Sequence, residues 1–337
     1  MDARKTSHPV ILSVYPIAEH HVDTLAESGA TVVVAPSDDE DTLIAAAADA
    51  SAIITRGPAR ITSAVLDSAT LLKVVSGIGS GTDSIDVAHA TERGVVVTSG
   101  VGLGKFAVAE WVIGAMLMAH RRMPSAHEEL AGGGLDWSSR FVRFRTRQVT
   151  GSSIGIIGMG EIGREIARLA HAFNMNVRAY DPFMKDAPPD YVEFCSDLDE
   201  MLAVSATVSV NVPLTPQTRD LIGAAQLACM SAGSVVVNAS RGGVVNEAAL
   251  ADALVRGHLA AAVLDVFDPE PPSPEQIRRL AAVPNLMLSP HVAGVTDAAF
   301  ERLVENAVDC VIDVLAGQRP QNVVNAPAAE RQELRSR

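Results

Sequence analysis

Three glycines near the middle of the chain, Gly158, Gly160 and Gly163, follow a short apolar run at 154–157, and the third lies at the start of a helix-like stretch at 161–173. In a strand–turn–helix unit with this G-x-G-x-x-G spacing, the first glycine allows a tight turn and the second lets a pyrophosphate approach the backbone. The third lets the helix pack closely on the strand. The N–H groups and partial positive charge at the start of the helix favour phosphates. The spacing therefore predicts a dinucleotide-binding turn.

A second apolar run, at 177–180, ends in Asp181, about 20 residues beyond the turn. A carboxylate at this strand end accepts hydrogen bonds from the ribose hydroxyls of the adenosine half, and it repels a 2′-phosphate. The expected cofactor is therefore NAD rather than NADP. The alternative interpretation of Asp181 is a turn residue before Pro182.

Short apolar runs alternate with helix-like stretches on both sides of the turn. They lie at 10–14, 31–34, 52–55, 72–75 and 95–98 before it, and at 177–180, 207–210, 234–238, 261–264 and 286–288 after it. This alternation predicts an α/β fold, and two doubly wound parallel-sheet domains fit it better than one very wide sheet. Long, mostly apolar helices are expected at 105–121 and 297–315. They would suit a chain that leaves its first domain, builds a second and returns.

The composition excludes several classes of protein. With 27 Lys and Arg against 40 Asp and Glu, the net charge of −13 argues against nucleic acid or an anionic membrane as a partner. Three cysteines lie far apart without metal-ligand spacing, so neither a metal site nor a disulfide framework is expected. The N-terminal residues have no signal-peptide core, and no apolar run is long enough to span a membrane. A cytoplasmic protein is expected.

Three groups suited to carbonyl chemistry come shortly after strand-like runs, at the edge where open α/β sheets bind ligands. Arg241 could hold a substrate carboxylate in a bidentate contact. Glu270 lies among prolines that fix its backbone, and His291 lies at the end of a strand-like apolar run. A histidine kept protonated by a carboxylate suits proton transfer. Together with a nicotinamide cofactor, these groups form the set that hydride transfer to a carbonyl requires. The alternatives are a surface arginine, a solvated carboxylate and an ordinary histidine.

Taken together, the motifs resemble those of the NAD-dependent D-2-hydroxyacid dehydrogenase family over nearly the whole chain. The matching segments are the glycine turn at 158–163, Tyr180-Asp-Pro182, Asn211-Val-Pro-Leu-Thr-Pro-Gln-Thr-Arg219, Asn238-Ala-Ser-Arg-Gly242, Asp265-Val-Phe-Asp-Pro-Glu-Pro271 and Ser289-Pro-His-Val-Ala-Gly294. The resemblance implies a Rossmann cofactor domain at 101–290, inserted into a discontinuous, flavodoxin-like substrate domain at 1–100 and 291–337. It also implies a homodimer that acts on a small 2-oxo or 2-hydroxy acid.

The resemblance further implies roles for individual residues. Arg241 would bind the substrate carboxylate and carbonyl oxygen, and His291, hydrogen-bonded to Glu270, would be the general acid in reduction and the base in oxidation. Substrate contacts are expected from Arg56, Ser76, Gly77, Ile78, Gly79, Arg241 and His291, with backbone N–H groups at 76–79 open to an anion. Cofactor contacts are expected from Gly158, Met159, Gly160, Glu161, Ile162, Gly163, Tyr180, Asp181, Pro182, Val212, Pro213, Thr218, Ala239, Ser240, Arg241, Asp265, His291 and Gly294.

Departures from the family pattern bear on the substrate. Phosphoglycerate dehydrogenases typically carry an arginine where Gly77 stands, and their extended forms add a regulatory domain that this chain is expected to lack. Phosphite-oxidising relatives place a lysine near Ser80, and formate-oxidising relatives have glutamine where Glu270 stands. The favoured substrate is a glyoxylate- or hydroxypyruvate-type 2-oxo acid, with phosphoglycerate as an alternative.

Three interpretations stay open. A non-catalytic, NAD(H)-sensing corepressor is the alternative from another class, and the short segment after Val324 argues against it. Lys105 would bind a second acidic group or cap a helix. The glycine- and arginine-rich segment at 131–147 would form a solvated loop or an arm for oligomer contact.

Overall fold

The computed structural model describes residues 8–184 and 186–325. The described residues form two compact units, one made of 8–104 and 296–325 and the other of 105–184 and 186–295. Each unit is a parallel β-sheet covered by helices, so the α/β fold with two doubly wound domains is confirmed. The chain passes between the units at Gly104 and Thr296, a few residues beyond the expected boundaries.

The first unit contains a five-stranded sheet with the order β2-β1-β3-β4-β5. Its strands are β1 (Val10–Ser13), β2 (Thr31–Val34), β3 (Ala50–Thr55), β4 (Val74–Gly77) and β5 (Val96–Thr98). This is the order of flavodoxin-like doubly wound folds, in which ligands bind outside the carboxyl ends of the strands.

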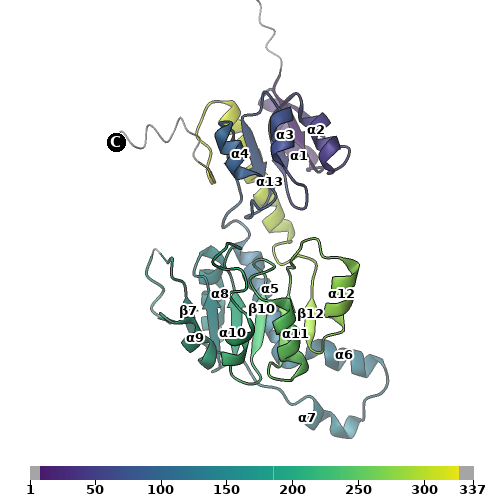
Figure 1. The fold of residues 1–337 in the computed structure, drawn as a ribbon, viewed down its shortest axis with the longest axis vertical. Coiled ribbons are helices and arrows are strands. Elements are labelled where there is room, and N and C mark those ends of the chain that lie inside the picture. Colours follow the sequence, from purple (N-terminus) through teal and green to yellow (C-terminus); the bar gives the residue numbers. More distant parts are fainter. Residues whose placement is uncertain (1–7, 185, 326–337) are drawn as a thin grey trace, which may run out of the picture. The chain divides into compact units, whose positions relative to one another are not determined.

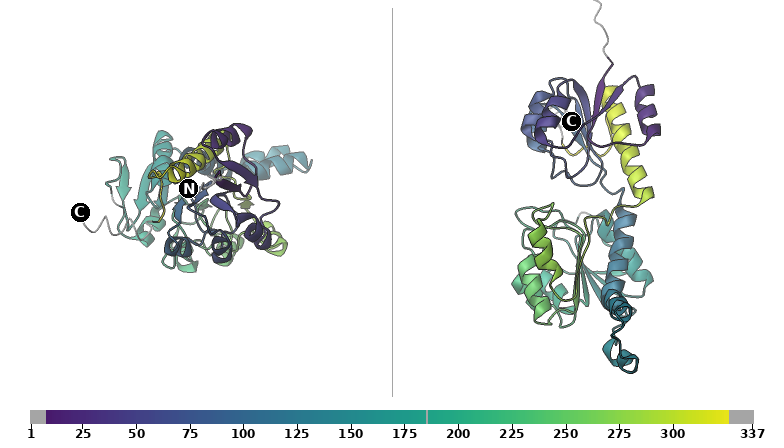
Figure 2. Two further views of the ribbon diagram at one scale, coloured as in Figure 1. Left: turned by 90° about the horizontal axis from the view of Figure 1, so that it is seen from above. Right: turned by 90° about the vertical axis from the view of Figure 1, so that its right-hand side faces the viewer.

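Helices cover both faces of this sheet (Figure 2). They are α1 (Glu19–Glu27), α2 (Glu40–Ala47), α3 (Ser63–Ser68), α4 (Val87–Glu92) and α13 (Asp297–Leu315). Apolar side chains of α1 and α13 pack on one face, and those of α2, α3 and α4 pack on the other. The predicted helix at 297–315 is thus confirmed, and it returns the chain to the first unit.

The second unit contains a seven-stranded sheet with the order β12-β11-β10-β9-β6-β7-β8. Its strands are β6 (Ser153–Ile157), β7 (Asn176–Tyr180), β8 (Val192–Phe194), β9 (Thr207–Val210), β10 (Val235–Asn238), β11 (Ala261–Leu264) and β12 (Leu286–Leu288). With β6 as the first strand, this is the Rossmann order, which reverses between β6 and β9. The sequence did not predict β8, an edge strand in which two of three residues are exposed.

Two layers of helices enclose this second sheet (Figure 1). They are α5 (Lys105–Arg121), α8 (Glu161–Ala172), α9 (Leu198–Val204), α10 (Ala224–Cys229), α11 (Glu247–Val255) and α12 (Pro274–Ala281). The long helix α5 packs on α8 and on β10 and β11, as its apolar sequence predicts. Helices α9 to α12 pack on the opposite face.

A short helical segment stands away from the body of the second unit (Figure 1). It contains α6 (Met123–Ala131), the 3-10 turn Trp137–Ser139 and α7 (Arg140–Arg143). We refer to residues 123–147 as the arm. None of the described helices is long and apolar enough to cross a membrane.

Candidate active site

The glycine turn joins β6 to α8, and its glycines are required by close backbone contacts. Gly158 has a φ of +90°, and a Cβ there would lie 2.6 Å from the carbonyl oxygen of Asn211. A Cβ on Gly163 would lie 2.0 Å from the carbonyl oxygen of Gly158. The turn therefore packs against its own helix and against the segment that follows β9, as a dinucleotide-binding turn does.

The N-terminus of α8 has room for an anionic group. Its N-cap residue, Gly160, makes no side-chain cap, and nothing lies within 4 Å of the position that a Cβ on this glycine would occupy. By contrast, α9 and α11 are capped by the side chains of Asp197 and Asn246. An uncapped helix start that faces open space fits the pyrophosphate of a dinucleotide.

Asp181 follows β7 and is held beside the turn. Its Oδ2 accepts a hydrogen bond from the N–H of Met159 at 2.9 Å, and its Oδ1 accepts one from the N–H of Phe183 at 2.9 Å. The backbone carbonyl of Tyr180, just before it, accepts a hydrogen bond from the N–H of Gly158. Each carboxylate oxygen has a second acceptor site, so this arrangement fits the ribose hydroxyls of NAD.

Lys105 and Glu161 form an ion pair next to this turn. The Nζ of Lys105, the first residue of α5, lies 2.5 Å from Oε2 of Glu161, the first residue of α8. The sequence predicted that Lys105 binds an acidic group of the substrate or caps a helix, and it did not predict the pair with Glu161. A carboxylate at the start of α8 would repel a pyrophosphate bound there, and the ammonium group of Lys105 neutralises this charge.

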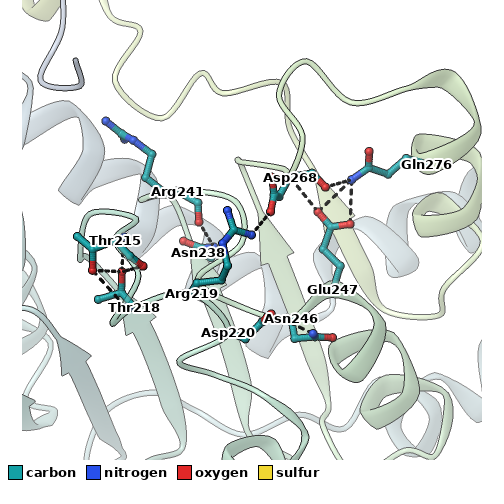
Figure 3. Close-up of polar contacts among 10 residues, drawn as sticks. All are labelled: Thr215, Thr218, Arg219, Asp220, Asn238, Arg241, Asn246, Glu247, Asp268 and Gln276. Atoms are coloured by element: carbon teal, nitrogen blue, oxygen red, sulfur yellow. Dashed lines mark hydrogen bonds and ion pairs between the residues drawn. The ribbon is translucent and has the colours of Figure 1, made fainter. Parts of the chain in front are cut away.

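Other predicted cofactor contacts lie in segments that follow β9 and β10. Val212 borders the glycine turn, with its Cγ1 2.8 Å from the position of a Cβ on Gly158. The hydroxyl of Thr218 donates to the carbonyl of Pro213 at 2.6 Å and accepts the N–H of Thr215 at 2.8 Å, so it closes its own turn (Figure 3). Contact of these residues with the cofactor stays a prediction.

Arg241 is presented by a tight turn after β10. The amide of Asn238 donates to the carbonyl of Arg241 at 2.9 Å, and its Oδ1 accepts the hydroxyl of Ser240 at 2.8 Å. A Cβ on Gly242 would lie 1.8 Å from the carbonyl oxygen of Phe267, so this turn presses directly on the segment after β11. Figure 3 shows the side chain of Arg241 extending away from the Arg219–Asp268 pair.

Four side chains fix the segment that leads to Glu270 (Figure 3). Arg219 Nη1 lies 2.5 Å from Asp268 Oδ2, and Gln276 Nε2 donates to the carbonyl of Asp268 at 3.1 Å. Glu247 accepts the N–H of Asp268 at 3.2 Å and the amide of Gln276 at 2.9 Å. Nothing in the spacing of Glu247 and Gln276 indicates that they meet, so this contact cannot be predicted from the sequence.

Asp265 holds the segment that carries His291. This carboxylate is fully buried, and its Oδ1 accepts the hydroxyl of Ser289 at 2.6 Å and the N–H of Val292 at 2.9 Å. Its Oδ2 accepts the N–H of Ala293 at 2.8 Å. The structure thus gives Asp265 a positioning role, whereas its predicted contact with the cofactor stays a prediction.

His291 meets Glu270 directly. Its Nδ1 is hydrogen-bonded to Oε1 of Glu270, and its side chain is 45% exposed. His291 has a φ of +53°, a rare value for a non-glycine residue and one that often marks a functional site. The hydrogen bond that the protonated imidazole donates to Glu270 raises the pKa of His291, whereas desolvation and the nearby charge of Arg241 oppose that rise. The three predicted catalytic residues therefore act on one another electrostatically.

Two of the predicted substrate residues in the first unit have polar groups that already bond other residues of this unit. Arg56 is exposed and lies 4.8 Å above the ring of Tyr15. The hydroxyl of Ser76 is buried against Thr98 at 2.7 Å, and the N–H of Ile78 donates to the carbonyl of Thr55 at 2.7 Å. The expectation that the Ile78 N–H is open to an anion is therefore wrong, since sheet pairing continues one residue beyond β4. Gly79, with open space where a Cβ would stand, is the better candidate.

The order of the second sheet and the glycine turn define a dinucleotide-binding domain, and the Glu270–His291 pair adds groups suited to proton transfer. Residues 113–293 match the family model described as "D-isomer specific 2-hydroxyacid dehydrogenase, NAD binding domain". The chain belongs to this family, and NAD is the cofactor of its second unit.

Relatives agree with this assignment. A D-3-phosphoglycerate dehydrogenase of Methanocaldococcus jannaschii is 34% identical over 96% of this chain and 61% of its own length. A hydroxypyruvate reductase of Thermotoga maritima is 34% identical over 79% of this chain and 85% of its own length. The crystal structure of the TT0316 protein from Thermus thermophilus matches with a TM-score of 0.85 at 32% identity, over 94% of this chain and all of that one. The chain spans about three fifths of the phosphoglycerate dehydrogenases that it matches.

The Lys105–Glu161 pair predicts an effect on cofactor affinity. In Lys105→Met, the negative charge of Glu161 is no longer neutralised and repels the pyrophosphate of the cofactor. The Kd for NADH should therefore rise by about threefold to tenfold. Adding Glu161→Gln to this variant should restore the affinity. Both Kd values are measured by titration calorimetry.

Arg168→Met is the matched control, because it breaks an ion pair with Glu165 on the same helix. This control should bind NADH as the wild type does. Equal affinity in the wild type and in Lys105→Met would contradict charge compensation at the turn.

Proposed function

We propose that this chain is an NAD-dependent oxidoreductase that interconverts a small 2-oxo acid and the corresponding D-2-hydroxy acid. The observation that carries the proposal is the Glu270–His291 hydrogen bond beside Arg241, within a unit that also holds the NAD-binding turn. The family's printed description, a D-isomer specific 2-hydroxyacid dehydrogenase, supports the stereochemistry.

The residues divide the chemistry among them. When bound, NADH supplies the hydride that reduces the carbonyl carbon. His291 gives a proton to the carbonyl oxygen in reduction and takes it back in oxidation, and its Nε2 is the atom for this transfer because Nδ1 bonds Glu270. Arg241 binds the substrate carboxylate through its guanidinium group. Arg56, Gly77 and the backbone N–H of Gly79 are further proposed substrate contacts, whereas the Ser76 hydroxyl and the Ile78 N–H already bond Thr98 and Thr55.

The substrate class is a glyoxylate- or hydroxypyruvate-type 2-oxo acid. A relative named hydroxypyruvate reductase, of which this chain covers 85%, supports it. D-3-phosphoglycerate is the second candidate, because several relatives at 34–36% identity are named D-3-phosphoglycerate dehydrogenase. Glycine at position 77 favours the first candidate, since it offers no charge to a phosphate.

Turnover against a panel of substrates tests this function. NADH and NADPH oxidation is measured with glyoxylate, hydroxypyruvate, pyruvate and phenylpyruvate, and NAD reduction with D-3-phosphoglycerate. We expect NADH-dependent reduction of at least one small 2-oxo acid, and His291→Ala and Arg241→Ala should lose at least about 100-fold in kcat/KM.

His171→Ala, an exposed histidine of α8, is the control and should keep full activity. Undiminished reduction by His291→Ala would contradict the mechanism. Tight NADH binding without turnover of any substrate would favour a non-catalytic NAD(H)-sensing protein instead.

The raised pKa of His291 predicts a pH dependence. Reduction needs the protonated imidazole, so its rate should be constant at low pH and fall as the pH rises through the raised pKa. Oxidation should show the opposite trend. Glu270→Gln removes the main cause of the shift, so the fall in reduction rate should move to lower pH. An unchanged profile in Glu270→Gln would show that Glu270 does not set this pKa.

We also propose that the arm forms a homodimer contact with a second copy of this chain. Its apolar side chains are strongly exposed, with Phe141 at 75% and Val142 at 85%. A groove of about 550 Å³ lies between α6 and α7, and it is lined by Leu130, Phe141 and Phe144. Such exposure on a projecting segment is typical of a covered interface rather than of a solvated loop.

Sedimentation of the double variant Phe141→Ser, Val142→Ser tests the dimer. We expect the wild type to sediment as a dimer at micromolar concentration and the variant as a folded monomer, because the apolar contact is lost. Val255→Ser, which changes an exposed valine on α11, should stay dimeric. A dimeric arm variant or a monomeric wild type would contradict the proposal.

The cytoplasm is the compartment that we propose. The observation that supports the proposal is the wide spacing of Cys195, Cys229 and Cys310 in the sequence, which is not that of a disulfide framework.

A further inference from the structure

Two adjacent histidines and a glutamate come together in the first unit, apart from the residues of the proposed reaction. His20 and His21 lie in the first turn of α1, and Glu301 lies in the first turns of α13. The Nε2 of His20 lies 2.8 Å from Oε1 of Glu301, and the Nε2 of His21 lies 3.2 Å from the same oxygen. One ligand atom from each of the three residues lies within 4.8 Å of the others.

His21 makes this cluster unusual. Its side chain is only 5% exposed, and its Nε2 makes no hydrogen bond among the described residues despite its distance from Glu301. A buried polar atom without a partner costs free energy, so most such atoms in proteins are satisfied. A bound cation at the cluster would give this nitrogen its partner.

The distances fit a metal ion with little rearrangement. Tetrahedral zinc binds imidazole nitrogen at about 2.0–2.1 Å, which places neighbouring ligand atoms about 3.3 Å apart. The separations of 2.8 and 3.2 Å need only a small opening of the cluster. Two imidazoles and one carboxylate favour a divalent transition metal over magnesium or calcium, which prefer oxygen ligands.

We propose that His20, His21 and Glu301 bind a divalent transition-metal ion of the zinc class, with water as the fourth ligand. His20 is exposed and Glu301 is partly exposed, so the ion has access from solvent. The ion would tie α1 to α13, which already pack against each other. Because Glu301 lies 281 positions along the chain from His20, the unfolded chain does not bring all three ligands together, and binding stabilises the folded first unit.

Zinc titration of the full-length, untagged protein after chelator treatment tests the site. Calorimetry with Zn²⁺ alone should show one strong site per chain, and Co²⁺ should give the visible absorption of a low-coordinate site. His20→Gln and Glu301→Gln each remove one ligand from an accessible position and should weaken zinc binding by more than about tenfold. Zn²⁺ should raise the Tm of the wild type and leave that of Glu301→Gln unchanged.

His89→Gln is the matched control. His89 forms a surface pair with Asp67 at the same 2.8 Å distance, but it is not part of a cluster that could hold a metal. This variant should bind zinc like the wild type. The proposal is overturned if the wild type does not bind zinc, or if His20→Gln and Glu301→Gln bind it as tightly as the wild type. The Tm of each variant without metal confirms that it is folded.

Discussion

The buried carboxylate of Asp265 is the interaction on which the proposed active site depends. It accepts one hydroxyl and two backbone N–H groups from residues 289–293, and it is inaccessible to solvent. Hydrogen bonds to a charged acceptor are worth about 1.5–3 kcal/mol each, enough to hold His291 at its unusual φ of +53°. The direction of the imidazole is therefore set by the end of β11 rather than by a free loop.

Further contacts fix the segments that follow β10 and β11. Gly242 lets the Arg241 turn touch the backbone after β11, and the pair Arg219–Asp268 holds that backbone together with Glu247 and Gln276. Arg241, Glu270 and His291 thus lie on short segments that follow the adjacent strands β10, β11 and β12 at one edge of the sheet. Such preorganisation favours proton transfer, because the acid need not be reoriented for each turnover.

Local patterns in the sequence predicted most of the fold. The glycine turn, both long helices and the meeting of Glu270 with His291 could be predicted, because each depends on a short spacing or a strand end. Contacts between distant residues could not be predicted: Glu247 meets Gln276, Lys105 pairs with Glu161, and His21 lies beside Glu301 only through tertiary packing. The hydrogen bond from the Ile78 N–H could not be predicted for the same reason, since its acceptor, the carbonyl of Thr55, lies on the neighbouring strand β3.

The central claim is that Glu270 keeps His291 protonated as the acid of the reaction. An NMR titration of the His291 imidazole, assigned by comparison with His291→Ala, measures this directly. We expect the pKa of His291 to lie above the ordinary histidine value of about 6.5 in the wild type, and at or below that value in Glu270→Gln. The same pKa in both proteins would contradict it.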